Sequence, residues 1–111
     1  MFKDLDPLLH SQLRLAIMSL LLNMEEAEFT YLKQETGSTQ GNLSVQLGKL
    51  KDAGYITIKK EFRNNYPLTT CSITQLGIQR FKDYADALQE YLKKEQATDQ
   101  APDPPLIKRK R

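Results

Sequence analysis

The feature that most constrains the fold of this chain is a pair of short helical segments separated by a glycine. Gly37 follows the first segment, "YLKQET", in the position where glycine commonly ends a helix. In the second segment Leu43, Leu47 and Leu50 recur at helical spacing and form one apolar stripe. Gly54 closes this second helix. Two helices joined by a tight glycine turn, with the leucines of the second directed inward, are typical of a helix-turn-helix.

The flanking segments extend this pattern. Apolar residues at helical spacing predict a heavily buried helix over residues 11–23. After Gly54 the period becomes alternating, which predicts a strand over 56–62 with Phe62 on its apolar side. "RNNYPL" has the composition of a turn, and "TTCSI" reads as the second strand of a hairpin. Thr74 then caps a long final helix. We therefore expect a mainly α fold with a small β-hairpin (α+β), a winged helix-turn-helix with a long C-terminal helix.

Two local assignments complete the expected secondary structure. The charged stretch "MEEAE" is expected to be a turn, and Thr30 is expected to cap the short helix that follows it. At 111 residues the chain has the size of one domain. We expect residues 1–95 to form that domain and residues 96–111, a basic segment containing prolines, to be a disordered tail.

Composition narrows the functional classes. The longest apolar run, "LRLAIMSLLL", contains Arg14 and is far shorter than the roughly 20 residues of a membrane span. Because no secretory signal is apparent, we expect a cytoplasmic protein with no membrane partner. A single cysteine, Cys71, and a single histidine, His10, leave no multi-cysteine zinc site and no internal disulfide. We expect no metal, no cofactor and no enzymatic activity, since no nucleophile–base pair, paired carboxylates or phosphate loop is present.

These two residues have plain structural interpretations. His10 is expected to stand at a helix boundary rather than to bind a ligand. Cys71 is on the apolar side of a strand, so a buried, inert thiol is favoured over a redox sensor.

The charge is unevenly distributed along the chain. Residues 1–29 carry two basic and five acidic groups, whereas residues 30–63 carry six basic and three acidic groups. The positive charge is therefore gathered on the segment that contains the helix pair and the first strand. A polyanion would be attracted to one face of such a molecule.

The second helix of the pair has glycines in unusual positions. At 100° per residue, Gly41, Val45 and Gly48 lie opposite the leucine stripe. Each glycine inside a helix costs about 1 kcal/mol relative to alanine, so something other than helix stability favours them. A helix surface with little bulk, small polar groups and an apolar contact for a thymine methyl fits a DNA major groove. The alternative is that the glycines allow another helix of the same fold to pack closely.

Three stretches carry a resemblance to a known family: "LDPLLHSQLRLAIM", "FTYLKQETGSTQGNLSVQLGKLKDAGYI" and "TTCSITQLGIQRF". Over residues 5 to about 92 the chain resembles the small winged-helix transcriptional regulators of the MarR and ArsR type. The resemblance implies a dimeric DNA-binding repressor or activator, with residues 39–53 as recognition helix and 59–69 as wing. The wing departs from the family pattern because Arg63 is the only charge in its turn, which argues against strong insertion into the minor groove. The chain is also short, so the resemblance does not imply an effector pocket.

The predicted contacts with double-stranded DNA fall into two classes. Small or polar residues on the recognition helix would contact bases or the backbone, although either Ser38 or Thr39 is expected to be the helix cap. Basic residues would contact phosphates, the alternative being that they are simply solvated. The predicted DNA-binding set is Ser38, Thr39, Gln40, Asn42, Ser44, Val45, Lys49, Lys51, Lys59, Lys60 and Arg63.

The last helix predicts a second interface. A helix of about 20 residues spans about 30 Å, the diameter of a small domain, so part of it would project beyond its own core. Its apolar stripe, together with leucines near the N-terminus, suggests a twofold contact; alternatively the stripe only covers the domain. The predicted dimer interface is Leu5, Leu8, Leu9, Phe81, Tyr84, Leu88, Tyr91 and Leu92.

Together these features indicate a sequence-specific DNA-binding transcriptional regulator. As a homodimer it would occupy a pseudo-palindromic operator and present two recognition helices to major grooves about 34 Å apart. The alternative function is that of a winged-helix protein–protein interaction module without specific DNA binding. The neutral folded region and the weakly basic wing keep that alternative open.

Overall fold

The structure is a computed structural model that describes residues 2–99. Four helices and three strands follow one another along the chain. They are α1 (Gln12–Met24), β1 (Glu26–Glu28), α2 (Phe29–Thr36), α3 (Gln40–Asp52), β2 (Ile56–Arg63), β3 (Tyr66–Ile73) and α4 (Gln75–Asp99). The predicted class, mainly α with a small β component, is confirmed. Because α4 continues to Asp99, part of the predicted tail is helical, and residues 100–111 lie outside the described residues.

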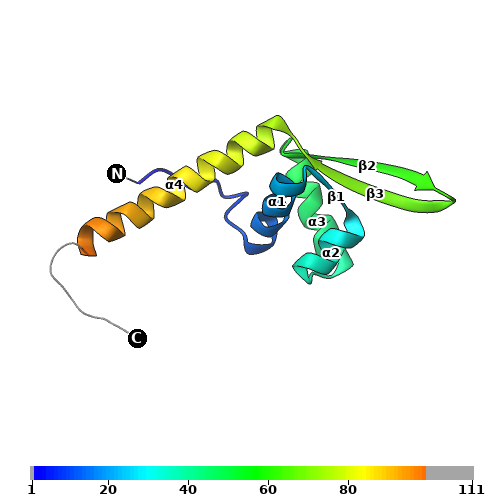
Figure 1. The fold of residues 1–111 in the computed structure, drawn as a ribbon, viewed down its shortest axis with the longest axis horizontal. Coiled ribbons are helices and arrows are strands. Elements are labelled where there is room, and N and C mark those ends of the chain that lie inside the picture. Colours follow the sequence, from blue (N-terminus) through cyan, green and yellow to red (C-terminus); the bar gives the residue numbers. More distant parts are fainter. Residues whose placement is uncertain (1, 100–111) are drawn as a thin grey trace.

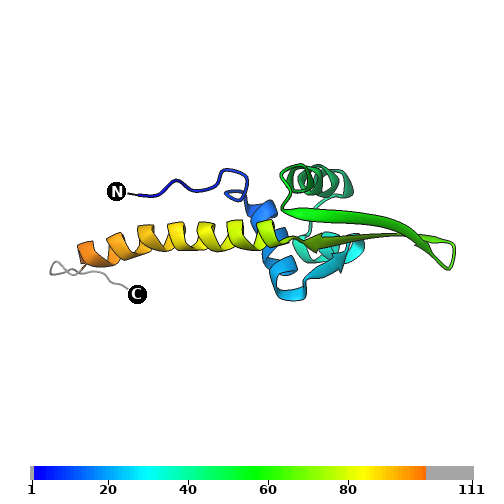
Figure 2. The ribbon, with the colours of Figure 1, turned by 90° about the horizontal axis from the view of Figure 1, so that it is seen from above.

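Three helices form the body of the molecule, from which two long elements extend in opposite directions. In Figure 1, α1, α2 and α3 gather at the centre, the β2–β3 hairpin extends to one side and α4 to the other. Figure 2 shows the same arrangement from above, with the N-terminal segment running beside α4. Within residues 2–99, no helix combines the length and the apolar character that a membrane crossing requires.

The sheet has three antiparallel strands in the order β1-β3-β2, one more than the predicted hairpin. The stretch expected to be a charged turn contains β1, whose central residue Ala27 is buried and pairs with Cys71. The assignment as a turn was wrong because this pairing joins distant parts of the sequence. β1 pairs only with residues 70–72 of β3, so the outer half of the hairpin extends without a third strand.

The hairpin turn is also shorter than the sequence suggested. Only Asn64 and Asn65 separate the strands, with φ of 53° and 67°. Two consecutive residues with positive φ match a type I′ turn, in which asparagine is among the preferred residues. The remaining residues of "RNNYPL" belong to the strands, and Pro67 pairs with Phe62.

The helix pair is built as predicted. Leu43, Leu47 and Leu50 of α3 are at most 2% exposed, which confirms the leucine stripe. Thr39, rather than Ser38, caps α3, because its side chain accepts a hydrogen bond of 3.1 Å from the Asn42 N–H. Gly37 ends α2 with φ of 69°.

The predicted cap of α2 is wrong. The helix begins at Phe29 with Glu28 in the N-cap position, so Thr30 lies inside the first turn. No side chain caps this helix. Since β1 ends where α2 begins, the sheet pairing of Glu28 holds the entry to the helix instead.

The start of α4 is tied to the junction between α3 and β2. Thr74 caps the helix as predicted: its Oγ1 accepts from the Gly77 N–H at 2.9 Å and lies 2.7 Å from the Gly54 carbonyl oxygen. A Cβ added to Gly77 would lie less than 3.0 Å from the backbone oxygen of Tyr55, which is closer than real Cβ atoms come. Only glycine allows α4 to pack this closely at its first turn.

Candidate nucleic-acid interface

The outward face of α3 is open. Val45 is 55% exposed, and a Cβ added to Gly41 or Gly48 would meet no heavy atom within 4 Å. The glycines therefore do not serve helix packing within the described chain, which excludes that alternative. They leave a ridge of low bulk along the helix, with Val45 as its single apolar side chain.

One flank of this ridge faces the hairpin. Gln40 and Ser44 of α3 line a hollow of about 290 Å³, together with Lys60 and Thr69 of the two strands. Phe29, Leu47 and Ile58 complete its lining. We call this hollow the hairpin groove. It brings predicted base-contacting and phosphate-contacting residues together around one space.

The opposite flank of α3 faces α1. Gln46 donates from Nε2 to Oδ1 of Asn42 at 3.1 Å, and the Oε1 atom of Gln46 accepts a hydrogen bond from Nη1 of Arg14. Arg14 is itself held by a bond from its Nε to the Leu8 carbonyl at 2.5 Å. Gln46 and Arg14 were absent from the predicted site. The spacing of Gln46 four residues after Asn42 is the signal that indicates the first contact.

The alternating pattern of β2 separates the basic residues of the hairpin. Lys60 pairs with Thr69 and lies on the side of α3, in the hairpin groove. Lys59 points to the opposite face, where its Nζ lies 3.1 Å from a carboxylate oxygen of Glu61. Arg63 belongs to that face as well.

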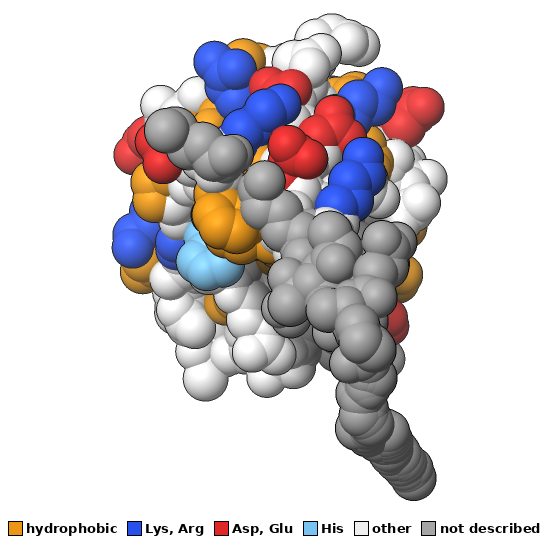
Figure 3. All heavy atoms as spheres, turned by 90° about the vertical axis from the view of Figure 1, so that its left-hand side faces the viewer, with side chains coloured by type: hydrophobic (Ala, Val, Ile, Leu, Met, Phe, Trp, Pro, Cys, Tyr) orange, Lys and Arg blue, Asp and Glu red, His pale blue; other side chains and the backbone are white. Residues whose placement is uncertain are grey.

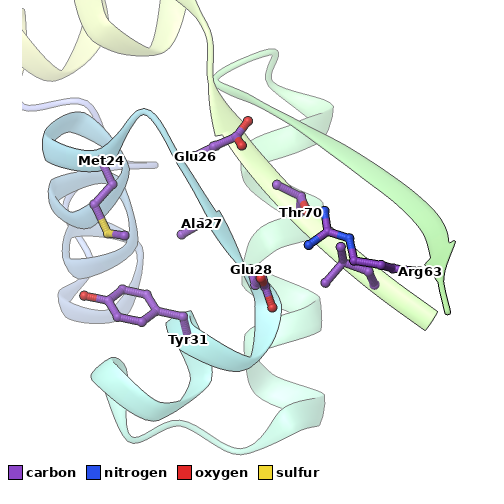
Figure 4. Close-up of a pocket in the computed structure, with 8 residues that line it drawn as sticks. Met24, Glu26, Ala27, Glu28, Tyr31, Arg63 and Thr70 are labelled. Carbon is purple, nitrogen blue, oxygen red and sulfur yellow. The ribbon is translucent and has the colours of Figure 1, made fainter. Parts of the chain in front are cut away.

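Arg63 lines a second hollow, of about 460 Å³, on the far side of the sheet. Figure 4 shows Arg63 lying beside Thr70, across from Glu26 and Glu28 of β1, with Met24 and Tyr31 on the other wall. Two exposed carboxylates in this hollow reduce its attraction for phosphate. The predicted phosphate contacts Lys59 and Arg63 are therefore separated from α3, and Lys60 is the one basic residue of the hairpin that lies on the side of α3.

The hairpin tip is apolar rather than basic. Phe62 and Tyr66 are 77% and 75% exposed, on either side of the Asn64–Asn65 turn. Phe62 was expected on the buried side of a half-buried strand, and this was wrong because the outer half of the hairpin extends past the core. Within residues 2–99, the core does not extend far enough to cover this part of the strand, so Phe62 stays exposed.

The other predicted contacts lie at the two ends of α3. Ser38 is half-buried, with its Oγ 2.9 Å from Oγ1 of Thr36. Lys49 and Lys51 are exposed in the last turn, where cations also stabilise the helix dipole.

The predicted dimer residues divide into buried and exposed groups. Leu9 and Tyr84 are 0% and 6% exposed in this chain alone, so these two are corrected to core residues that offer no surface to a partner. Leu5, Leu8 and Phe81 are partly buried against the same core. Leu88 and Leu92 remain 38% and 57% exposed on the projecting part of α4.

The N-terminal segment covers one side of this projection. The ring of Tyr91 stacks on Phe2 with centroids 4.4 Å apart, and its hydroxyl donates to the Lys3 carbonyl at 3.3 Å. Figure 3 views the molecule from this end and shows hydrophobic side chains beside His10, the pale blue residue. The exposed apolar surface of α4 therefore lies next to the N-terminal segment, which packs against Tyr91.

The residues considered for chemistry have structural roles. His10 precedes the Ser11 cap of α1, and its Nδ1 lies 2.9 Å from the Tyr84 hydroxyl. Cys71 is fully buried, and burial raises the pKa of its thiol to about 11, which keeps it protonated and unreactive at neutral pH. Among the described residues, no group of three or more histidine, cysteine or acidic side chains could hold a metal ion.

A tyrosine links the N-terminal turn to the base of the hairpin. The hydroxyl of Tyr55 donates to Oδ2 of Asp6 at 2.5 Å. Burial, and then the bond to Asp6 and its negative charge, raise the pKa of Tyr55 to about 12. The phenol therefore stays protonated and keeps this bond over the whole neutral range.

Comparison with known proteins agrees with this geometry. A family model described as a winged helix DNA-binding domain matches residues 13–92. An uncharacterised protein of Methanocaldococcus jannaschii is 37% identical over 75 residues, which cover 68% of this chain and 82% of that protein.

Solved structures show the same arrangement. A transcriptional regulator homologue from Pyrococcus horikoshii superposes with a TM-score of 0.73 at 27% identity, over 78% of this chain and 85% of that one. The transcriptional regulator BldR from Sulfolobus solfataricus, at 18% identity, gives a TM-score of 0.64 over 78% of this chain and 61% of that one, and shows the fold alone. These findings confirm the resemblance to winged-helix transcriptional regulators.

Proposed function

Because this chain belongs to the winged helix DNA-binding domain family, we propose that it is a sequence-specific DNA-binding transcriptional regulator that acts as a homodimer. The open ridge of α3 carries the proposal: two helical glycines with free space around them, flanked by Asn42 and Ser44. A helix of this kind can approach the floor of a major groove closely. The β2–β3 hairpin is then the wing, lying against the backbone or the adjacent minor groove.

The hairpin groove supports the phosphate contacts. Lys60 provides a cation, and Gln40 and Ser44 provide hydrogen-bonding groups on the facing helix. A neighbouring hollow includes Gln40, Lys33 and the acidic residue Glu28, so a second cation lies along the same side of the wing, with one carboxylate beside it. Charged and polar groups that converge on one groove position a DNA backbone, while the ridge of α3 reads the bases.

The exposed leucines of α4 support the homodimer. Leu88 and Leu92 lie on the element that extends away from the reading helix. A symmetric contact through this surface would place two copies of α3 on the same side of a duplex, in major grooves one helical turn apart. A cytoplasmic location is part of this proposal.

Lys59 and Lys60 lie on opposite faces of the wing, and this difference allows the phosphate contact to be tested. We expect Lys60→Ala to weaken binding to all sequences and to lower the slope of log affinity against log salt by about 1, the effect of one lost phosphate contact. Lys59→Ala is the matched control, because Lys59 lies on the opposite face and is paired with Glu61. The two slopes are measured by mobility shift or fluorescence anisotropy over a range of salt concentrations. Equal slopes in the wild type and Lys60→Ala would reject the contact.

The exposed aromatic tip favours the second candidate function, a protein interaction module. Phe62 and Tyr66 are the most exposed large apolar residues of the described chain, and aromatic residues are enriched in protein interfaces. This function predicts that the wild type shows no affinity for DNA at low or moderate salt. Binding that selects a symmetric sequence from random DNA would reject it in favour of the regulator.

A further inference from the structure

A chain of hydrogen bonds runs from the body of the domain to the reading face of α3. It begins at the Leu8 carbonyl, passes through Arg14 of α1 to Gln46, and ends at Oδ1 of Asn42. Asn42 is exposed and Gln46 is half-buried, so the last bond lies at the edge of the open ridge. None of these contacts is needed to cap or pack α3, whose cap is Thr39 and whose core residues are leucines.

The chemistry of arginine fixes the direction of every bond in this chain. A guanidinium group only donates hydrogen bonds, so the group of Gln46 that faces Arg14 has to be the carbonyl oxygen Oε1. The NH₂ group of Gln46 then faces Asn42, and this group can only donate. The atom of Asn42 that receives it is therefore Oδ1, at 3.1 Å. The NH₂ group of Asn42 is left pointing away from Gln46.

We propose that Gln46 is a positioning residue that makes Asn42 present hydrogen-bond donors to the DNA. The proposal rests on the proposed function, since it assigns the class of base that α3 reads. In the major groove guanine offers two acceptors, N7 and O6, whereas cytosine offers the N4 donor. Adenine N7 and thymine O4 each offer one acceptor, so Asn42 held in this orientation excludes cytosine and favours guanine most, because guanine alone offers two acceptors.

Arg14 determines this choice from outside the reading helix. Its Nε is held by the Leu8 carbonyl, and α1 contributes Ile17, Met18 and Leu21 to the core. The guanidinium is thus anchored to the most buried part of the fold. Had residue 14 been an acceptor, both amides would have been turned over and the preferred base would have been of the opposite class.

The test inverts the last bond without changing the shape of the residue. In the variant Gln46→Glu the new carboxylate still accepts from Arg14 but has no N–H to donate, so Asn42 has to rotate its amide and donate to the carboxylate. Asn42 then presents Oδ1 to the DNA. We expect the preferred base at one symmetric position of each half-site to change from guanine to a base with a major-groove donor, cytosine or adenine, with the guanine-to-cytosine affinity ratio shifting at least about tenfold, the lower end of what one base contact discriminates. Selection from random DNA identifies the position, and titration of the paired duplexes measures the ratio.

Three variants separate positioning from general damage. Gln46→Met removes both polar groups at similar volume and is expected to relax discrimination at that position alone. Asn42→Ala is expected to abolish discrimination there, both in the wild-type background and in combination with Gln46→Glu. Arg14→Lys remains a donor and is expected to keep the preference for guanine. The added negative charge of Gln46→Glu weakens binding to all sequences alike, so it leaves the ratio unaffected.

Each result decides the matter. If the wild type selects a sequence and Gln46→Glu selects the same base at every position, the positioning role is overturned while the proposed function stands. The same conclusion follows if Asn42→Ala leaves all preferences unchanged. If the wild type selects no sequence at all, the proposed function is overturned and this inference with it.

Discussion

The helices α3 and α4 each leave one face uncovered, and the two faces differ in kind. The open face of α3 is made of Gly41, Gly48, small polar residues and one apolar side chain, Val45, whereas the open face of α4 carries Leu88 and Leu92. Their glycines differ in the same way. A Cβ added to Gly41 or Gly48 of α3 would meet free space, whereas one added to Gly77 of α4 would collide with the backbone of Tyr55. A face of low bulk suits close approach by a nucleic acid, and a face of large apolar groups suits a second protein surface.

The largest expected effect is on the α4 face. Replacing both Leu88 and Leu92 with glutamate should dissociate the proposed homodimer, because four leucines of a symmetric contact are lost and four charges are introduced. Burial of a leucine contributes about 1.5–3 kcal/mol, and these leucines are already partly covered. We expect a loss of about 3 kcal/mol or more, which raises the dissociation constant more than about 100-fold. Sedimentation equilibrium measures it.

Gln89→Glu is the control for this pair. It adds a negative charge between the two leucine positions in sequence without removing apolar surface. A wild-type chain that sediments as a monomer at micromolar concentration would show that the α4 face does not join two copies.

The second-largest effect is expected on the free energy of unfolding when Gly77, which packs against the backbone of Tyr55, is replaced. Gly77→Ala should lower the free energy of unfolding by about 2–3 kcal/mol, as overpacking of a tight contact does. The added Cβ would collide with the Tyr55 oxygen, and backbone cannot move aside as a flexible side chain can. Urea denaturation measures the change. An unchanged free energy of unfolding would mean that the first turn of α4 can shift away from Tyr55 without destabilising the fold.

The outward glycine should respond in the opposite direction. Gly48→Ala should raise the free energy of unfolding by up to about 1 kcal/mol, because alanine is the better helix former and the added Cβ meets nothing within 4 Å. The same change should weaken DNA binding by hindering close approach to the groove. Paired denaturation and anisotropy measurements test both parts. Tighter DNA binding by the alanine variant would contradict the proposed reading face.

The smallest effect on stability at neutral pH is expected for Tyr55, which lies in the connection between α3 and the first strand of the wing. Its folded pKa of about 12 exceeds the value of about 10 expected in the unfolded chain. The protonated phenol therefore stabilises the fold fully below about pH 10, and this contribution is lost as the pH rises from about 10 toward about 12. Absorbance of tyrosinate and urea midpoints, compared between the wild type and Tyr55→Phe, measure the loss. A phenol that titrates near its ordinary pKa in the folded protein would refute the bond to Asp6.

Most of the fold follows from local sequence patterns. The helical spacing of leucines defines α3, and the glycines that end α2 and α3 stand where the sequence places them. The third strand escaped prediction because β1 has only three residues, two of them glutamates, and is defined by its pairing with β3. The burial of Leu9 and Tyr84 was likewise set by distant packing.

The candidate site shows the same limit. The open ridge of α3 follows from helical period alone, and strand alternation would have assigned Lys59 and Lys60 to opposite faces. The role of Gln46 does not follow from α3, because Arg14 of another helix decides how its amide is turned. Likewise, the exposure of Phe62 depends on how far the hairpin outreaches the core.

The contacts of Thr74 and Gly77 at the start of α4 would determine the distance between the two reading helices in the proposed homodimer. Gly54 and Tyr55, which connect α3 to β2, lie there within hydrogen-bonding distance of Thr74, the cap of α4, and the backbone oxygen of Tyr55 lies against Gly77 in the first turn of α4. In a pair of chains linked through α4, a small change in the direction of that helix at this fixed pivot would alter the separation of the two reading helices by an amount that grows with the length of α4. The angle between α4 and the rest of the domain would thus determine which spacing of operator half-sites the pair of chains can bind.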